Sequence, residues 1–269
     1  MRVLLAGCGD LGQRLGLRLA AQGHEVFGLR RRIEALPPEI RGLRADLYRL
    51  ESLDGLPADL DAVVCTLTPD SRDPAGYQRA YVHAPLNLVR ALGSRQPAWV
   101  FASSTAVYGG DFGGLVDDDS PTCPEGFNGQ ILLEAEQALG QAVPRLRVLR
   151  FSGLYGPGRE MLLRRARAGG ACEPRWGNRI HVEDAVSALE LALWAPDLPE
   201  VCIASDGTPA REDEVLAWLA GRLGCAAPRC APGIERGRRI LPRRLQAAGF
   251  VPRYADFRLG YSSLLQPPG

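Results

Sequence analysis

The 269-residue sequence predicts an α/β fold built on a parallel sheet, and two observations support this prediction. Short apolar runs that suit buried strands alternate with segments of helical periodicity, a pattern typical of right-handed βαβ units. The first apolar run, residues 3–6, leads directly into Gly7, Gly9 and Gly12 in the G-x-G-x-x-G spacing, and a helical pattern follows. Together these features predict a doubly wound parallel sheet of the Rossmann type.

The glycine turn is the part of the sequence that points most directly to a ligand. The first glycine of such a turn permits a tight bend, the second lets a pyrophosphate approach the main chain, and the third allows close packing of strand and helix. Asp10 and Leu11 begin the helix that follows, where free N–H groups face the phosphates. Cys8 lies inside the turn as a small packing residue. We therefore expect Gly7, Gly9, Asp10, Leu11 and Gly12 to bind a dinucleotide; a purely structural turn is the alternative.

Composition restricts the class of protein. The 46% hydrophobic and 23% charged content is typical of an ordinary globular chain, and the net charge of +1 gives no reason to expect nucleic acid or an acidic membrane as partner. No apolar run approaches the roughly 20 residues of a membrane span, so the cytoplasm is the expected location. Seven scattered cysteines without a C-x-x-C and three distant histidines predict neither a disulfide framework nor a metal site. The remaining expected partner is a small-molecule substrate.

The second strand bears on cofactor choice. Residues 24–29 read as this strand, and Arg30, Arg31 and Arg32 follow it. An acidic residue at this place would hold the ribose 2′-OH of NAD, whereas arginine suits the 2′-phosphate of NADP. The alternative is a solvated run of charges. We predict NADP as the cofactor in preference to NAD, with Arg30 and Arg31 in its site.

The remaining strands of the sheet follow in order. Residues 43–47, with Asp46 near their end, read as the third strand, and residues 61–67, which include Thr66, as the fourth. A helix rich in Ala and Leu is expected between Asp73 and Gly93. The fifth strand, residues 98–105, ends in hydroxyl side chains. Because ligands bind at the carboxyl ends of such strands, Ser103, Ser104 and Thr105 are expected to emerge at the site.

Several motifs in one order carry a family resemblance. After the glycine turn and Asp46 come residues 103–109 (SSTAVYG), 150–159 (RFSGLYGPGR), 178–185 (NRIHVEDA) and the tail around residues 238–261. In this order the chain resembles the extended branch of the short-chain dehydrogenase/reductases, the NAD(P)-dependent epimerases and dehydratases. It looks most similar to the compact, atypical sugar nucleotide epimerase-like members.

The resemblance implies roles for individual residues. Arg30 takes the place where NAD-using relatives carry Asp, and Asp46 lies near the adenine. Ser104 matches the catalytic Ser/Thr that hydrogen-bonds the reacting oxygen, with strand capping as the alternative. The cofactor site would also include Thr66, Ser103 and Tyr155, and residues 155–159 would border the nicotinamide; a structural Pro-Gly turn is the alternative for this segment. His181 would open a helix, more as a packed or backbone-bonded residue than as a catalytic one.

One departure from the family pattern concerns the chemistry. The family places a Tyr and, four residues later, a Lys on one helix face, because the ammonium lowers the phenol pKa. With Gly129 and Glu136 fixing the register of the expected helix 128–136, these places hold Asn128 and Leu132, both expected to face the nicotinamide cleft. The chain contains no lysine at all, so the pair cannot arise elsewhere.

Three alternatives for the chemistry follow from this departure. Tyr108 acts instead, a residue of the acidic loop 117–119 acts instead, or the protein binds without reacting. A solvated surface turn is the plain alternative for the acidic loop.

The resulting hypothesis has two forms. The first is an NADP(H)-binding epimerase, dehydratase or reductase acting on a sugar-like or other carbonyl small molecule; the alternative is a non-catalytic NADP sensor. Residues 1–151 and 178–205 would form the cofactor-binding domain, and residues 152–177 and 206–269 a small substrate-side domain. In this second half of the chain we expect helices at residues 161–168 and 212–223 and a strand at residues 201–204. Apolar faces on two helices would bury either against the sheet or against a second subunit in a homodimer: Leu86, Leu88, Val89, Leu92, Ile131, Leu133 and Leu139.

Overall fold

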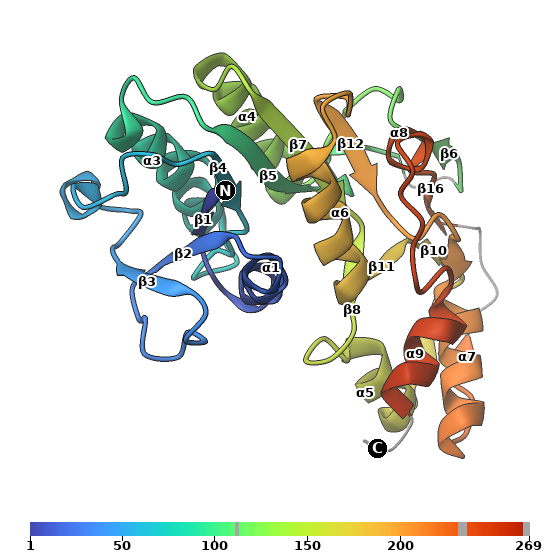
Figure 1. Ribbon diagram of the computed structural model, residues 1–269. Helices are drawn as coiled ribbons and strands as arrows, with labels where there is room; N and C mark the ends of the chain where they lie inside the picture. The colour runs from blue at the N-terminus through green and yellow to red at the C-terminus, as the bar shows by residue number, and fades with distance from the viewer. Residues whose placement is uncertain (111–112, 231–235, 266–269) are drawn as a thin grey trace.

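A seven-stranded parallel sheet forms the centre of the protein (Figure 1). The computed structural model describes residues 1–110, 113–230 and 236–265. The strands stand in the order β12-β7-β5-β4-β1-β2-β3, and each neighbouring pair is parallel. They are β1 (Arg2–Ala6), β2 (Glu25–Arg30), β3 (Arg41–Arg44), β4 (Ala62–Cys65), β5 (Ala98–Ser104), β7 (Leu146–Phe151) and β12 (Val201–Ala204). The strand order reverses direction between β1 and β4, so the predicted doubly wound Rossmann-type fold is confirmed.

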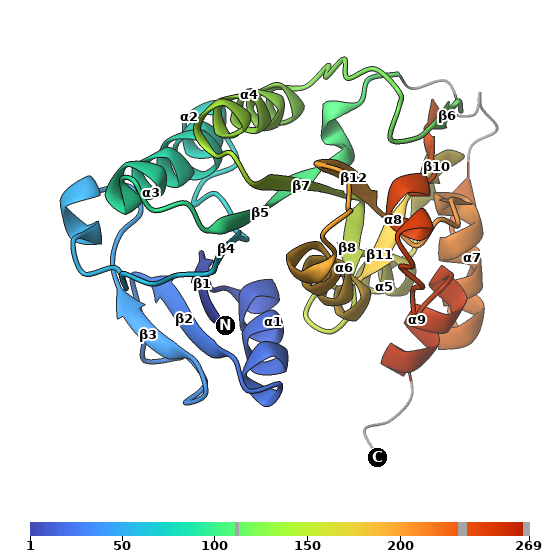
Figure 2. The same cartoon turned by 45° about the horizontal axis from the view of Figure 1, so that its top comes forward.

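Helices cover both faces of this sheet (Figure 2). On one face lie α1 (Asp10–Ala21) and α6 (Val182–Trp194). Leu11, Leu15 and Leu19 of α1 recur every four residues and are buried, which is why this segment folds as a helix against the sheet. On the other face lie α2 (Pro74–Tyr77), the π-helical turn η2 (Gln78–His83), α3 (Ala84–Leu92) and α4 (Phe127–Ala142).

The helix expected between Asp73 and Gly93 is confirmed, with a π turn in its middle. The Asp73 carboxylate accepts a hydrogen bond from the Gly76 N–H, which caps the helix and lowers the pKa of Asp73. Gly93 ends it with a φ of +60°, a conformation that suits glycine. The η2 turn packs against α4, so it lies beside the helix on which the family carries its Tyr and Lys.

The third strand lies two to three residues earlier than predicted. β3 ends at Arg44, opposite Arg30 of β2, and the chain then turns. Asp46 therefore lies after the strand, where its carboxylate accepts a hydrogen bond from the Tyr48 N–H. This correction moves Asp46 out of the strand and onto the carboxyl edge of the sheet.

Four of the seven residues considered for a dimer interface pack inside the chain. Leu88, Leu92, Ile131 and Leu139 are buried in the core between sheet and helices. The other three, Leu86, Val89 and Leu133, are partly buried at its edge. Burial against the sheet therefore accounts for most of this apolar surface, and the homodimer stays a prediction.

Three further helices lie together beyond the carboxyl edge of β7 and β12 (Figure 1). A separate core cluster joins α5 (Met161–Ala168), α7 (Glu212–Leu223) and α9 (Phe257–Leu265), and it includes Tyr155. The helices expected at 161–168 and 212–223 are confirmed. The other elements are short: η1 (Leu50–Leu53), η3 (Thr105–Val107), β6 (Leu115–Val116), β8 (Gly153–Tyr155), β9 (Ala171–Cys172), β10 (Arg175–Gly177), β11 (Arg179–His181), β13 (Ala210–Arg211), β14 (Arg229–Cys230), β15 (Arg236–Gly237), β16 (Arg239–Ile240) and α8 (Arg243–Ala247).

Two expectations from composition are tested by the fold. The sequence predicts no disulfide framework, and the described residues contain one disulfide, between Cys172 and Cys230, where the parallel pairing of β9 and β14 brings the two Cα atoms to 4.5 Å. These cysteines are 58 residues apart, so their spacing gave no signal. Among the described residues, no helix is both long and apolar enough to cross a bilayer.

Candidate functional site

The glycine turn between β1 and α1 has the geometry of a phosphate site. Gly7 has a φ of +77°, and a Cβ there would lie 2.6 Å from the Leu67 side chain. A Cβ on Gly12 would lie 3.1 Å from the Thr66 hydroxyl, so this position also requires close packing. A Cβ on Gly9 would meet nothing nearer than a carbonyl oxygen at 3.9 Å, so open space lies beside it. The turn therefore leaves room for a ligand at the N-terminus of α1, where the first N–H groups of the helix have no intrahelical acceptor.

A pocket of about 260 Å³ continues from this turn along the carboxyl edge of the sheet. Its lining comes from the segments that follow β1, β2, β3 and β4, which is where open α/β sheets bind ligands. It is lined by Gly7, Cys8, Gly9, Leu29, Arg30, Arg31, Arg32, Ala45, Asp46, Leu47, Tyr48, Thr66, Leu67, Thr68 and Asp70. The predicted residues Arg30, Arg31, Asp46 and Thr66 thus meet the glycine turn in one cavity.

The arginines after β2 are held in different ways. Arg30 donates from Nη1 to the main-chain oxygen of Cys8 at 3.2 Å, which directs its side chain toward the glycine turn. Arg31 donates from Nη2 to Oδ1 of Asp70 at 2.7 Å and lies over the Tyr48 ring. Asp70 and Tyr48 were not anticipated from the sequence. Asp70 could have been found, because it follows β4 just as the arginines follow β2.

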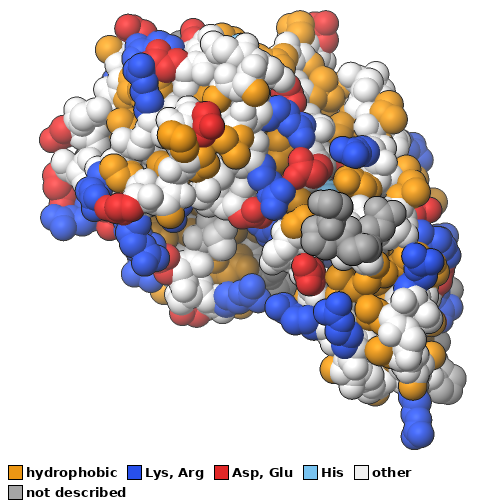
Figure 3. All heavy atoms as spheres, turned by 60° about the horizontal axis from the view of Figure 1, so that its bottom comes forward, with side chains coloured by type: hydrophobic (Ala, Val, Ile, Leu, Met, Phe, Trp, Pro, Cys, Tyr) orange, Lys and Arg blue, Asp and Glu red, His pale blue; other side chains and the backbone are white. Residues whose placement is uncertain are grey.

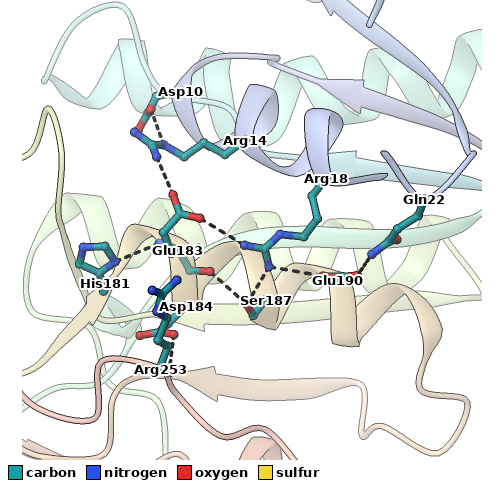
Figure 4. Close-up of polar contacts among 10 residues, drawn as sticks. All are labelled: Asp10, Arg14, Arg18, Gln22, His181, Glu183, Asp184, Ser187, Glu190 and Arg253. Carbon is teal, nitrogen blue, oxygen red and sulfur yellow. Dashed lines mark hydrogen bonds and ion pairs between the residues drawn. The ribbon is translucent and has the colours of Figure 1, made fainter. Parts of the chain in front are cut away.

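Ion pairs join the glycine-turn helix to α6 (Figure 4). Arg14 of α1 binds both Asp10 and Glu183, and Arg18 binds Glu183 and Glu190. The Asp10 carboxylate also accepts a hydrogen bond from Arg159, which lies in the segment 155–159. The start of α1 is therefore tied to the loop that the family resemblance places at the substrate mouth. The Leu11 side chain is buried, so only its main chain is available to a ligand.

The hydroxyl residues at the end of β5 point in different directions. Ser104 is half-buried and its Oγ accepts a hydrogen bond from the Ala106 N–H, so it caps the short η3 turn. Ser103 is buried and donates to Oε1 of Glu136 at 2.5 Å. Because neighbouring strand residues face opposite sides of the sheet, the two hydroxyls diverge, and the Ser103 hydroxyl is already engaged inside the chain. The expectation that Ser103 contacts the cofactor is therefore not supported, and the role of Ser104 stays a prediction.

A buried ionic network lies beneath this strand end. The guanidinium of Arg150 on β7 contacts Glu136 of α4 at 2.6 Å, and the two side chains are only 9% and 6% exposed. Arg150 also donates from Nη1 to the Tyr108 hydroxyl at 2.9 Å. Ser103 completes the network through Glu136. This pairing could have been suspected, because a charge inside an apolar strand requires a partner.

The structure does not support the prediction that Tyr108 is a catalytic residue. The side chain is 1% exposed, and burial raises the pKa of its phenol, while the Arg150 hydrogen bond fixes the hydroxyl within the network. A phenol that is buried and already paired has no access to a substrate. Tyr108 therefore serves the core.

The acidic loop is likewise structural. Asp118 is buried and accepts hydrogen bonds from the main-chain N–H groups of Ile203 and Arg244, and Asp117 pairs with Arg243. Asp119 pairs with Arg244. The loop is therefore not a free surface turn, because its carboxylates bind residues of β12 and α8. These contacts also leave the prediction of a catalytic acid in this loop without support.

The helix on which the family carries its Tyr and Lys forms as expected, as α4 (Phe127–Ala142), but it does not present both predicted positions in the same way. A Cβ on Gly129 would lie 2.2 Å from the Ala106 oxygen, so α4 approaches the η3 turn as closely as glycine allows. Asn128 is half-buried in the first turn of α4. Leu132 is 3% exposed and belongs to the core between sheet and helices. The expectation that residue 132 faces the cleft is therefore wrong for the leucine in this chain.

Tyr155 and His181 lie together in the core at the ends of β8 and β11. The Tyr155 ring packs against the Tyr261 ring and meets the His181 ring edge to face, and its hydroxyl donates to the main-chain oxygen of Asp256. The predicted cofactor contact of Tyr155 is not supported, because its side chain is buried and packs against Tyr261 of α9. His181 caps α6 by accepting a hydrogen bond at Nδ1 from the Glu183 N–H, as the backbone-bonded interpretation predicts.

The neutral state of His181 predicts an effect of pH on stability. Burial lowers the pKa of His181 to about 4 from an ordinary value of 6.5. The unfolded chain therefore takes up this proton at a higher pH than the folded chain, and stability falls as the pH falls from 6.5 toward 4. We expect His181→Asn, which preserves the cap, to reduce this loss by about 1 to 3 kcal/mol.

Urea melts of both proteins at pH 7.5 and pH 4.5 measure that difference. Comparing the two proteins cancels the opposite pH dependence of Asp206, whose pKa burial raises to about 7. Equal losses in both proteins would show that His181 titrates alike in the folded and unfolded states.

Surface charge is mixed. On the face drawn in Figure 3, arginine and acidic side chains are interspersed, in keeping with exposed ion pairs such as Arg258–Glu214. Within the described part of the chain, no group of three or more His, Cys, Asp or Glu side chains could hold a metal ion.

The chain is similar to one family model, one curated protein and two solved structures. Residues 1–168 match the family model described as "RmlD substrate binding domain". The chain is 32% identical to Protein YeeZ of Escherichia coli (strain K12), over 95% of this chain and 97% of that protein. A structure from Methylobacillus flagellatus, whose name assigns it to the NAD-dependent epimerase/dehydratases, is 35% identical with a TM-score of 0.84, over 98% and 97% of the two chains. MoeE5, solved in complex with UDP-glucose and NAD, is 27% identical with a TM-score of 0.81, over the same shares.

Proposed function

Because the chain belongs to the extended short-chain dehydrogenase/reductases, the NAD-dependent epimerase/dehydratase family, we propose that it binds NADP(H) and acts on a nucleotide-sugar or similar carbonyl compound. The observation that carries the cofactor proposal is the pocket beside the glycine turn, which Arg30, Arg31 and Arg32 all line. The ligands of MoeE5 support the class of cofactor and substrate. NADP(H) would supply or accept a hydride at its nicotinamide ring.

Different residues of the chain would bind different parts of the cofactor and the substrate. Gly7, Gly9 and Gly12 shape the turn for the pyrophosphate, and the N–H groups of Asp10 and Leu11 donate to it. Asp46 and Thr66 border the adenosine end, and Arg30 pairs with the 2′-phosphate. Ser104 hydrogen-bonds the reacting oxygen. We further propose that residues 152–177 and 206–269 form the substrate side.

The first test is cofactor preference. We expect NADPH to bind more tightly than NADH by about tenfold or more, which corresponds to about 1.4 kcal/mol and suits one charge-assisted phosphate contact. Arg30→Ala should remove most of this preference. Fluorescence titration with both nucleotides measures it. Equal affinities in the wild type, or an unchanged preference in Arg30→Ala, would refute the NADP proposal.

The second test concerns turnover. Asn128 and Leu132 cannot exchange a proton near neutral pH, and general acid–base help is worth about 10²- to 10⁴-fold in rate. We expect little activity on common nucleotide-sugars, and any turnover should depend on Ser104. Assays of wild type and Ser104→Ala, with cofactor binding as a control for folding, check this expectation. Robust epimerase activity that survives Ser104→Ala would overturn the assignment of the site.

A second candidate function is favoured by the replacement of the family's Tyr and Lys. The absence of lysine together with Asn128 and Leu132 suits a protein that binds NADP(H) without reacting and reports its level to a partner. Cofactor binding with no turnover over a broad panel of sugar nucleotides and carbonyl compounds would support this sensor.

A further inference from the structure

An ion pair spans the adenosine end of the pocket. Arg31 follows β2 and Asp70 follows β4, and both line the same cavity. The Arg31 Nη2 atom lies 2.7 Å from Oδ1 of Asp70, so the two segments are joined across the cavity by a charge-assisted hydrogen bond. The Arg31 guanidinium is thus already bound to an anion of the chain itself.

The surroundings hold the Arg31 guanidinium in position without burying it. Its Cζ atom lies 5.8 Å from the centre of the Tyr48 ring, and Arg79 lies 5.7 Å from the same ring. The Tyr48 ring thus lies beside the Arg31 guanidinium at the wall of the pocket. The side chains of Arg31 and Asp70 are nevertheless 57% and 42% exposed, and ion pairs in such solvated positions contribute little to stability. An incoming dianion can therefore replace Asp70 at Arg31.

Arg30 lines the same pocket but, unlike Arg31, has no carboxylate among the described residues as its hydrogen-bond acceptor. Its Nη1 atom donates to the main-chain oxygen of Cys8, which is a neutral acceptor. A 2′-phosphate would meet Arg30 without displacing a carboxylate, whereas Arg31 must exchange one anion for another. The two arginines are thus unequal as partners for the same phosphate.

We propose that Asp70 tunes the selectivity of the pocket for 2′-phosphorylated nucleotides by competing with the 2′-phosphate for Arg31. This inference rests on the proposed NADP(H) site and identifies a residue that limits its preference. Asp70 lowers the affinity for NADP(H) and leaves the affinity for NAD(H) unchanged.

The test uses small probes that differ only in the phosphate. Calorimetric titrations with 2′,5′-ADP and 5′-AMP isolate the adenosine end, and NADPH and NADH repeat the comparison on whole dinucleotides. Asp70→Asn keeps the size of the side chain and removes its charge. We expect it to bind 2′,5′-ADP and NADPH about two- to fivefold more tightly, as suits the loss of one exposed ion pair, with 5′-AMP and NADH unchanged.

A double-mutant cycle separates competition from simple repulsion. If Asp70 acts by occupying Arg31, then Asp70→Asn has no effect on 2′,5′-ADP binding in an Arg31→Ala background. An equal gain in both backgrounds would mean that Asp70 repels the phosphate directly, and would contradict the proposal. The control variant is Asp59→Asn, because Asp59 precedes β4 at the opposite edge of the sheet and also pairs with an arginine, Arg2. It should change no affinity.

Failure of this inference is distinguishable from failure of the proposed function. If the wild type prefers NADPH and Arg30→Ala loses that preference, the function stands, and an unchanged 2′,5′-ADP affinity in Asp70→Asn then refutes the inference alone. A loss of affinity for all four nucleotides in Asp70→Asn would refute it too, because the ion pair would then be holding the adenosine in place.

Discussion

Leu132→Lys is expected to lower the free energy of unfolding by about 3 kcal/mol or more, because a buried ammonium loses its hydration without gaining a partner. The leucine side chain is 3% exposed and lies in the core between the sheet and α4. Urea denaturation at pH 7 measures the change. The deficit should shrink as the pH rises toward the ordinary lysine pKa of about 10.4, since the unfolded chain then also loses the proton.

Asn128→Tyr is the matched control for that substitution. Residue 128 is half-buried in the first turn of α4, so a larger polar side chain there has access to solvent and should cost about 1 kcal/mol or less. The double variant Asn128→Tyr/Leu132→Lys should be as unstable as Leu132→Lys alone. If Leu132→Lys melts with the wild type, its ammonium reaches the cleft, and the family's Tyr and Lys could be rebuilt in this chain.

Removing one partner of the Glu136–Arg150 pair is expected to cost about 3 to 5 kcal/mol of stability, because the other charge stays buried without compensation. Arg150→Met removes the cation while retaining most of the apolar volume. It also leaves the Tyr108 hydroxyl without its donor. Chemical denaturation measures the loss.

The control for Arg150→Met is Arg49→Met, which removes an exposed pair with Glu51 and should cost less than about 1 kcal/mol. In the double variant Glu136→Gln/Arg150→Met neither charge is left, so its cost should be well below the sum of the single costs. Additive losses, or a loss in Arg150→Met no larger than in Arg49→Met, would contradict a structural role for the pair.

Several strands and helices could be predicted because each depends on the pattern of apolar residues within its own segment. The apolar runs at residues 3–6 and 201–204 and the helical segments at 161–168 and 212–223 carry their own periodicity, and the structure has them there. The end of β3 could not be predicted, because it is set by pairing with β2, where Arg44 meets Arg30. β7 was not singled out, since its run is interrupted by Arg147 and Arg150, whose partners lie on other elements.

In the candidate site, too, features set by local sequence could be predicted and features set by packing could not. The glycine turn and Arg30 could be predicted because main-chain geometry and residue type determine them. Tyr108, Tyr155 and Leu132 could not, because a motif fixes the place of a residue along the chain and packing decides which way its side chain points.

The most direct test of the proposed NADP(H) site is a crystal structure of the protein with NADPH bound. We expect the pyrophosphate to lie against the N–H groups at the start of α1 and the 2′-phosphate to lie within hydrogen-bond distance of Arg30. We expect the nicotinamide to lie beside Ser104. A complex in which the 2′-phosphate points into solvent, or in which the nucleotide lies outside the pocket lined by Arg30, Arg31 and Arg32, would contradict it.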